Sequence, residues 1–124
     1  MTDDDKIALL QRFAAAWNAH DADALVDLMT EDGVFLGAAG PAPSGSHHQG
    51  MAALRAAYSA IWERVPDAAW TEVQHFVSGD RGVTEWVFTG TGPDGAPIKV
   101  AGCDVFTLQD GRIAIKDTYR KNVT

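Results

Sequence analysis

The chain has 124 residues, a hydrophobic fraction of 46%, a net charge of -7 and a single cysteine, Cys103. This length fits one domain of ordinary size, so we expect residues 1–124 to form a single domain. One cysteine excludes an intrachain disulfide and a cysteine-based zinc site. The acidic balance disfavours nucleic acid and anionic membrane surfaces as partners.

The sequence gives no signal for a membrane or an export pathway. No apolar segment approaches the ~20 residues of a membrane-spanning helix. The chain begins MTDDD, which is the opposite of the basic start of a signal peptide. We therefore expect a cytoplasmic protein with no membrane partner.

Apolar residues recur every three to four positions in the first half, which predicts three helices. The first covers Asp3–Ala19, and a shorter one follows Asp21, a residue type that caps helices. The third covers Met51–Arg64 and is ended by Pro66. The core side of the first helix would carry Ile7, Leu10, Phe13, Ala14 and Trp17.

The second half changes to a period of two, which predicts β-strands. A short strand, Val34–Leu36, is followed by a loop rich in Gly, Pro and Ser from Gly37 to Gly50. Four further strands are expected at Trp70–Ser78, Val83–Thr91, Ile98–Leu108 and Arg112–Tyr119. Helices followed by an antiparallel meander predict an α+β fold with the helices on one face of a curved sheet.

Two segments carry a resemblance to a known superfamily. FAAAWNAHDADALVDLMTEDGVF (Phe13–Phe35) and GCDVFTLQDGRIAIKDTYRK (Gly102–Lys121) resemble the nuclear transport factor 2-like proteins of the SnoaL-like branch. The resemblance implies a cone-shaped α+β barrel, in which a curved mixed or antiparallel sheet wraps around N-terminal helices and encloses a pocket. The superfamily holds polyketide cyclases, ketosteroid isomerases and non-catalytic binding modules, so the fold alone does not decide the function.

The family's functional positions carry over one residue at a time. Asp104 falls where ketosteroid isomerases keep a protonated aspartic acid in the oxyanion hole. The tyrosine of that hole would fall near Phe13 and the catalytic base near Gly37, and neither residue can serve. The acid/base aspartate of SnoaL-type cyclases falls at Thr118, next to Asp117. Ketosteroid isomerisation by the family mechanism is therefore not expected.

Turn lengths give an expected register for the last three strands. A three-residue loop at 109–111 would place Asp104 opposite Lys116, with Phe106, Thr118 and Arg120 on the same face. A two-residue turn at 94–95 would place Asp104 opposite Glu85. The other face would then carry Trp86, Val105, Ile113 and Ile115. Because a wide apolar face is seldom left exposed, we expect a second copy to cover it and form a homodimer.

The charged side chains that share a face with Asp104 have two interpretations. As a catalytic site, Asp104 would act as the acid or base, with Glu85 and Lys116 tuning it. Arg120, Thr118 and Phe106 would then contact the substrate, as would Trp17 and Tyr58 from the helices. As a structural feature, the same charges would form a ladder of cross-strand ion pairs, and the aromatic residues would be core.

The histidines and the missing motifs limit the chemistry further. His47 and His48 are most simply a solvated loop pair, and His75 a hydrogen-bonded core residue, so no metal site is expected. No cofactor-binding motif occurs, and we expect no cofactor. The leading hypothesis is a cofactor-free acid/base enzyme of isomerase, cyclase, dehydratase or hydrolase type that acts on a small apolar carbonyl compound. The alternative is a small-ligand-binding or dimerisation module that performs no chemistry.

Overall fold

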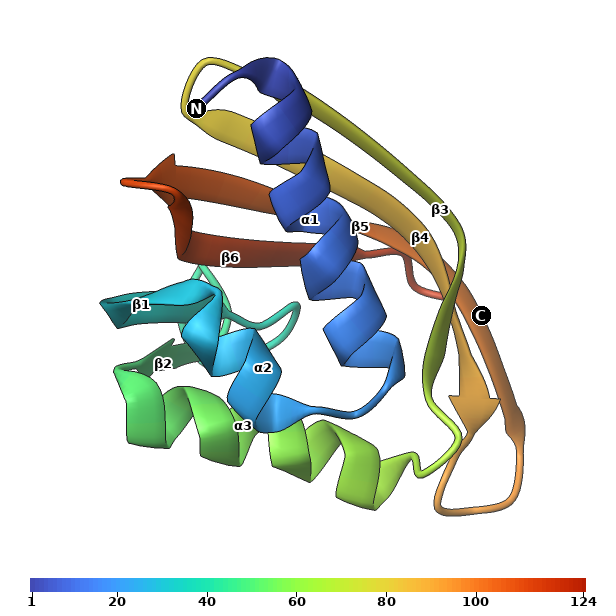
Figure 1. Ribbon diagram of the computed structural model, residues 1–124. Helices are drawn as coiled ribbons and strands as arrows, with labels where there is room; N and C mark the ends of the chain where they lie inside the picture. Colours follow the sequence, from blue (N-terminus) through green and yellow to red (C-terminus); the bar gives the residue numbers. More distant parts are fainter.

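A computed structural model describes residues 1–124 as three helices packed against one six-stranded sheet (Figure 1). The elements in chain order are α1 (Asp3–Asn18), α2 (Ala22–Asp27), β1 (Met29–Leu36), β2 (His47–Gln49), α3 (Met51–Arg64), β3 (Ala69–Ser78), β4 (Arg81–Thr91), β5 (Pro97–Gln109) and β6 (Arg112–Arg120). No helix is both long and apolar enough to cross a membrane.

The strand order is β2-β1-β6-β5-β4-β3, with β1 and β6 parallel and the other neighbours antiparallel. The long strands bend around α1, which lies on their concave side, and α3 runs across the open end (Figure 1). Edges remain at β2 and β3, so the sheet forms an open cone. The α+β class and the cone shape predicted from the sequence are confirmed.

Both N-terminal helices begin at side-chain caps that the sequence contains. The amide of Asp5 donates to the hydroxyl of Thr2 over 3.1 Å, and the amide of Thr2 donates back to the Asp5 carboxylate over 3.0 Å. Asp21 caps α2 by accepting from the amide of Ala24 over 3.1 Å, as predicted. These bonds satisfy amides that a helix start leaves without partners.

Aromatic side chains fill the concave side of the sheet. The Trp17 ring of α1 stacks on Trp70 at 4.4 Å, and Trp70 stacks on Trp86 at 5.5 Å. Phe13 packs edge-on against Phe106 and Tyr58. All of these side chains are buried. They form the hydrophobic core between α1 and the sheet.

Two features of the fold were not predicted. His47–Gln49 lies inside the expected loop but pairs with β1 as the edge strand β2, with His47 opposite Leu36. The strand β1 begins at Met29, earlier than expected, and joins β6 in parallel. Both pairings depend on contacts between segments far apart in the chain, which local periodicity does not report.

The register of β4 and β5 differs from the prediction by one residue. The hairpin closes at the pair Thr91 and Pro97, so five residues form the connection where two were expected. Asp104 therefore lies opposite Thr84, and Glu85 lies opposite Cys103. Because side chains alternate, a one-residue shift moves each side chain to the other face. The expected neighbour relation between Glu85 and Asp104 is wrong, and Trp86 lies on the inner face.

The register of β5 and β6 differs by two residues, so the predicted face is preserved. Asp110 and Gly111, both with positive φ of 52° and 79°, form a two-residue turn in place of the expected three-residue loop. A bulge at Ala114 then adds one residue on β6, because Leu108 pairs with Ile113 and Thr107 with Ile115.

The bulge has two consequences for the inner face of β6. Asp104 lies directly opposite Thr118, but Lys116 remains on its side of the sheet. Ile113, which we expected on the outer face beside Ile115, is fully buried in the core.

Candidate functional site

Asp104 is a fully buried carboxylate that accepts three hydrogen bonds. The ammonium of Lys116 donates to its Oδ1 over 2.8 Å, and the hydroxyl of Thr118 donates to the same oxygen over 2.5 Å. The indole Nε1–H of Trp86 donates to Oδ2 over 3.0 Å. Three donors around one carboxylate match its ionised form, which only accepts hydrogen bonds. This group is named the Asp104 cluster below.

Lys116 supplies the positive charge of the cluster from a position that is 2% exposed. Besides Asp104, its Nζ donates to the Thr118 hydroxyl oxygen over 2.8 Å. It also lies over the rings of Phe35, at 4.4 Å, and Trp70, at 5.5 Å. A buried ammonium is costly to desolvate unless charge pairing, hydrogen bonds and ring faces compensate, and this one has all three.

Tyr58 of α3 is the phenol nearest to this charge pair. Its hydroxyl donates to the thioether sulfur of Met29 over 3.1 Å. Burial, and to a lesser degree the charge of Asp104, raise the pKa of Tyr58 well above the ordinary value of 10.0. The hydroxyl is therefore a hydrogen-bond donor at every physiological pH.

His75 contacts Thr84, which lies next to the Asp104 cluster. Its Nδ1 lies 2.8 Å from the Thr84 hydroxyl, and Thr84 is the β-sheet partner of Asp104. Partial burial lowers the pKa of His75 below the ordinary 6.5, so the ring is neutral at pH 7. A hydrogen-bonded, half-buried histidine agrees with its predicted role.

A pocket of about 420 Å³ lies between the segment after β1 and the end of β6. It is named the β6 pocket here and is lined by Gly37, Ala38, Pro43, Ser44, Gly45, Asp117, Thr118, Tyr119 and Arg120. Since β1 ends at Leu36, β6 extends past it, and the Gly/Pro/Ser loop closes the gap. Thr118 belongs both to this wall and to the Asp104 cluster. Thr118 therefore links the wall of the pocket to the buried carboxylate.

Arg120 supplies a positive charge at the same pocket. Its guanidinium carbon lies 5.3 Å from the centre of the Phe88 ring. The two ion pairs of the chain join Lys116 to Asp104 and Arg55 to Asp23, so Arg120 has no carboxylate partner. Gly37 also lines the pocket at the position where a family base would fall, and it has no side chain to act as a base.

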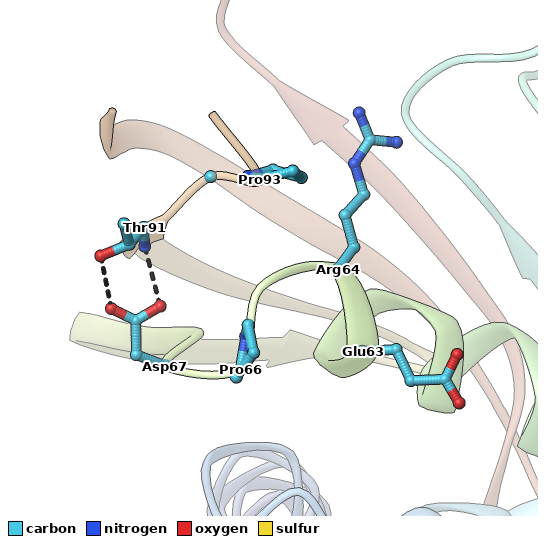
Figure 2. A pocket seen from close by; sticks show the side chains of 7 residues that line it. Glu63, Arg64, Pro66, Asp67, Thr91 and Pro93 are labelled. Carbon is cyan, nitrogen blue, oxygen red and sulfur yellow. Dashed lines mark hydrogen bonds between the residues drawn. The ribbon is translucent and has the colours of Figure 1, made fainter. Parts of the chain in front are cut away.

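A second pocket, of about 550 Å³, lies between the end of α3 and the β4–β5 hairpin (Figure 2). The Asp67 carboxylate accepts there from the amide and the hydroxyl of Thr91, both over 2.8 Å. These two bonds lower the pKa of Asp67. They fasten the hairpin to the segment after α3, and none of the site residues expected from the sequence lines this pocket.

The structure separates the predicted site residues into three groups. Asp104, Lys116 and Thr118 are in direct contact, and Arg120 lies with Thr118 at the β6 pocket. Three predicted substrate contacts are fully or almost fully buried core residues, namely Trp17, Tyr58 and Phe106.

Glu85 does not belong to the site. It is exposed on the outer face, because the β4–β5 register places it beside Cys103. Burial, followed by the nearby carboxylates of Asp104, Glu85 and Asp117, raises the pKa of the Cys103 thiol, so it is a poor nucleophile at neutral pH.

The sequence did not predict two residues, namely Trp86 in the Asp104 cluster and Thr84 beside it. Trp86 was assigned to the outer face by the register error, and Thr84 carried no motif. The only available signal was chemical: a buried indole N–H needs an acceptor, and Asp104 is the buried acceptor on the adjacent strand. No group of three or more His, Cys, Asp or Glu side chains lies close enough to hold a metal ion.

The model of the SnoaL-like domain family matches residues 10–115. The chain belongs to the SnoaL-like domain family. No curated protein matches it. An NTF2-like protein of unknown function from Mesorhizobium loti is 30% identical, with a TM-score of 0.78 over 97% of this chain and 93% of that one.

More distant solved structures agree on the fold. A candidate polyketide cyclase from Xanthomonas campestris is 21% identical, with a TM-score of 0.83 over 97% of this chain and 92% of that one. A protein with a ketosteroid isomerase-like fold from Catenulispora acidiphila, solved with trimethylamine, is 20% identical, with a TM-score of 0.79 over 90% and 83% of the two chains. This SnoaL-like domain therefore shares its whole architecture with proteins of differing description.

Replacing Lys116 by methionine tests the buried ion pair. Lys116→Met leaves the Asp104 carboxylate buried without its counter-charge, so we expect the free energy of unfolding to fall by about 3–5 kcal/mol. Urea denaturation measures the change. Arg55→Met removes the exposed pair with Asp23 and should cost no more than about 1 kcal/mol. Equal losses in the two variants would contradict a special role for the buried pair.

The lowered pKa of His75 predicts a pH dependence of stability. The unfolded state binds a proton near pH 6.5, whereas the folded state does so only at lower pH. The stabilising contribution of neutral His75 is therefore complete above pH 6.5 and is lost as the pH falls below it. Urea denaturation from pH 7.5 down to about pH 5 should show this loss, and it should be smaller in His75→Gln. An identical slope in both proteins would rule His75 out as its source.

Proposed function

We propose that this SnoaL-like domain is a cofactor-free acid/base enzyme that acts on a small, largely apolar carbonyl compound bound in the β6 pocket. The observation that carries the proposal is the position of Thr118, a residue that lines the pocket and whose hydroxyl donates to buried Asp104. A hydroxyl shared in this way connects a bound molecule to a carboxylate that solvent does not reach.

The contacts around Thr118 support a proton relay. Its oxygen accepts from Lys116 and its proton is directed at Asp104. When a bound carbonyl compound loses an α-proton to the Thr118 oxygen, the hydroxyl proton moves to Asp104, and the return path restores both groups. Lys116 holds the arrangement in place by donating to both Asp104 and Thr118.

Arg120 supports the same reaction and lines the pocket on the same strand as Thr118. Loss of an α-proton leaves negative charge on the carbonyl oxygen, and an unpaired guanidinium stabilises such charge. Arg120 has no carboxylate partner within the chain, so it is available for this contact. Isomerisation, cyclisation and dehydration of carbonyl compounds all begin with such an enolate.

A binding module is the second candidate, and one observation favours it. Both oxygens of Asp104 are already engaged, and the core around it is filled by aromatic rings. Phe13 and Gly37, where family enzymes carry a phenol and a base, offer no chemistry. On this account the β6 pocket holds a small ligand, and the Asp104 cluster only stabilises the wall. A cytoplasmic location remains a prediction for either candidate.

Solvent exchange of an enolisable ketone tests the proposed reaction. Proton NMR in deuterated buffer follows the α-protons of 2-tetralone, and we expect the wild type to accelerate their exchange. Thr118→Val, which keeps the shape but removes the hydroxyl, should lower the enzymatic rate about 100-fold, and Thr118→Ser should recover most of it.

Glu85→Gln is the matched control for that experiment, because Glu85 is a carboxylate of the neighbouring strand on the exposed face. It should exchange the ketone at the wild-type rate. If the ketone shifts the amide resonances of the β6 pocket without exchanging its protons, the domain is a binding module. An undiminished rate in Thr118→Val would exclude the relay.

We also propose that a second copy of the chain covers the outer face of the sheet. Phe76 is 52% exposed there, and the paired row continues through half-buried Val83 and Val105. Tyr119, on the same face of β6, is 56% exposed. Apolar side chains of this size on adjacent strands lose contact with water when two such faces pack together.

Sedimentation velocity at micromolar concentration checks the dimer. The wild type should sediment at twice the 13.3 kDa mass of the chain. Phe76→Arg adds a charge to the outer face without disturbing the core, so it should shift the population to monomer. A wild type that sediments only as a monomer would contradict the proposal.

A further inference from the structure

Ser44 and His47 form a hydrogen-bonded pair at the rim of the β6 pocket. The Ser44 Oγ and the His47 Nε2 are 2.5 Å apart, and both side chains are exposed. Ser44 also lines the pocket. A hydroxyl within hydrogen-bond distance of an imidazole nitrogen, open to solvent and beside a pocket, supplies the contact between nucleophile and base that activates a serine.

We propose that Ser44 and His47 hydrolyse small carboxylic esters that bind in the β6 pocket, with Arg120 stabilising the negative charge that develops on the carbonyl oxygen. This activity goes beyond the proposed enolisation, because it uses a different nucleophile and does not involve Asp104. The pocket volume of about 420 Å³ is within the usual range of small-molecule sites.

The backbone holds the two side chains in place. Gly45 has a φ of 83°, and a Cβ at this position would collide with the carbonyl oxygen of Gly37, so the turn after Ser44 requires glycine. The amide of Gly45 donates to Ala42 over 3.0 Å, and the amide of Gly37 donates to Ser46 over 2.9 Å. His47 is paired with Leu36 in the sheet. Nucleophile and base therefore lie on a tight turn and a paired strand, rather than on a free loop.

The pocket is lined by one positively and one negatively charged side chain, Arg120 and Asp117, and the positive charge favours attack on a carbonyl group. Arg120 lines the same pocket and has no carboxylate partner in the chain. A tetrahedral intermediate carries its negative charge on the former carbonyl oxygen, and a nearby guanidinium stabilises that charge more than it stabilises the neutral ester. The contact therefore lowers the barrier to the chemical step.

The reaction balances with the ester and water alone. With its proton on Nδ1, His47 accepts the Ser44 proton at Nε2 as Oγ bonds to the ester carbon. Collapse of the intermediate breaks the bond to the leaving oxygen, which takes the proton from His47 and departs as the alcohol. Water, deprotonated by His47, then attacks the acyl-Ser44, and cleavage of that bond releases the carboxylic acid and restores the serine.

p-Nitrophenyl trimethylacetate is the probe of choice, because its acyl group has no α-proton and cannot be enolised. We expect the wild type to release p-nitrophenol and to gain the mass of one trimethylacetyl group, which peptide mapping locates on Ser44. Ser44→Ala should abolish the label, and Ser44→Ala and His47→Gln should each lower the rate of p-nitrophenol release by about 100-fold.

The neighbouring pair provides a matched control. Ser46 bonds to His48 over 3.1 Å and does not line the β6 pocket, so Ser46→Ala should retain the wild-type rate and the label. Label on another residue, or an undiminished rate in Ser44→Ala, would overturn the proposal. Because this ester cannot be enolised, a negative result with 2-tetralone leaves the ester result standing, and the reverse also holds.

Discussion

The ion pair between Asp104 and Lys116 is the interaction on which the rest of the structure depends. Desolvating two such charges costs several kcal/mol for each, and this cost is offset only while the hydrogen bonds around them remain intact. Those bonds come from β4, β5 and β6 through Trp86, Asp104, Lys116 and Thr118. The register of three strands is therefore fixed at one point, and the wall of the β6 pocket is fixed with it.

Local sequence signals were sufficient for most of the fold. The capping residue Asp21, together with the helical period, marks the N-terminal helices, and the change to alternation marks the long strands. These features act within a few residues of one another. The strand β2 was not predicted, because three residues beside a Gly/Pro-rich loop have little intrinsic preference for a strand. Its formation depends on pairing with β1.

The site was predictable only where errors in register preserved the face. Asp104 and Lys116 were expected together and do meet, because a shorter turn and the bulge at Ala114 shift β6 by two residues in total. Glu85 was predicted on the wrong face because the register of β4 and β5 differs from the expected register by one residue. Turn length and bulges decide which face a side chain takes, and neither follows from the hydrophobic pattern. The β6 pocket was not predicted for a related reason, because it forms between a loop and a strand that are distant in the chain.

The stacked indoles on the concave side give the domain an optical property as well as a core. Trp17, Trp70 and Trp86 form a continuous column, and the last of them donates its N–H to Asp104. Ring transitions of parallel indoles at this spacing couple with one another, and the hydrogen bond ties the end of the column to the state of the carboxylate. Near-ultraviolet circular dichroism and intrinsic fluorescence thus contain a contribution from the Asp104 cluster, beside that of Trp62, without an added label.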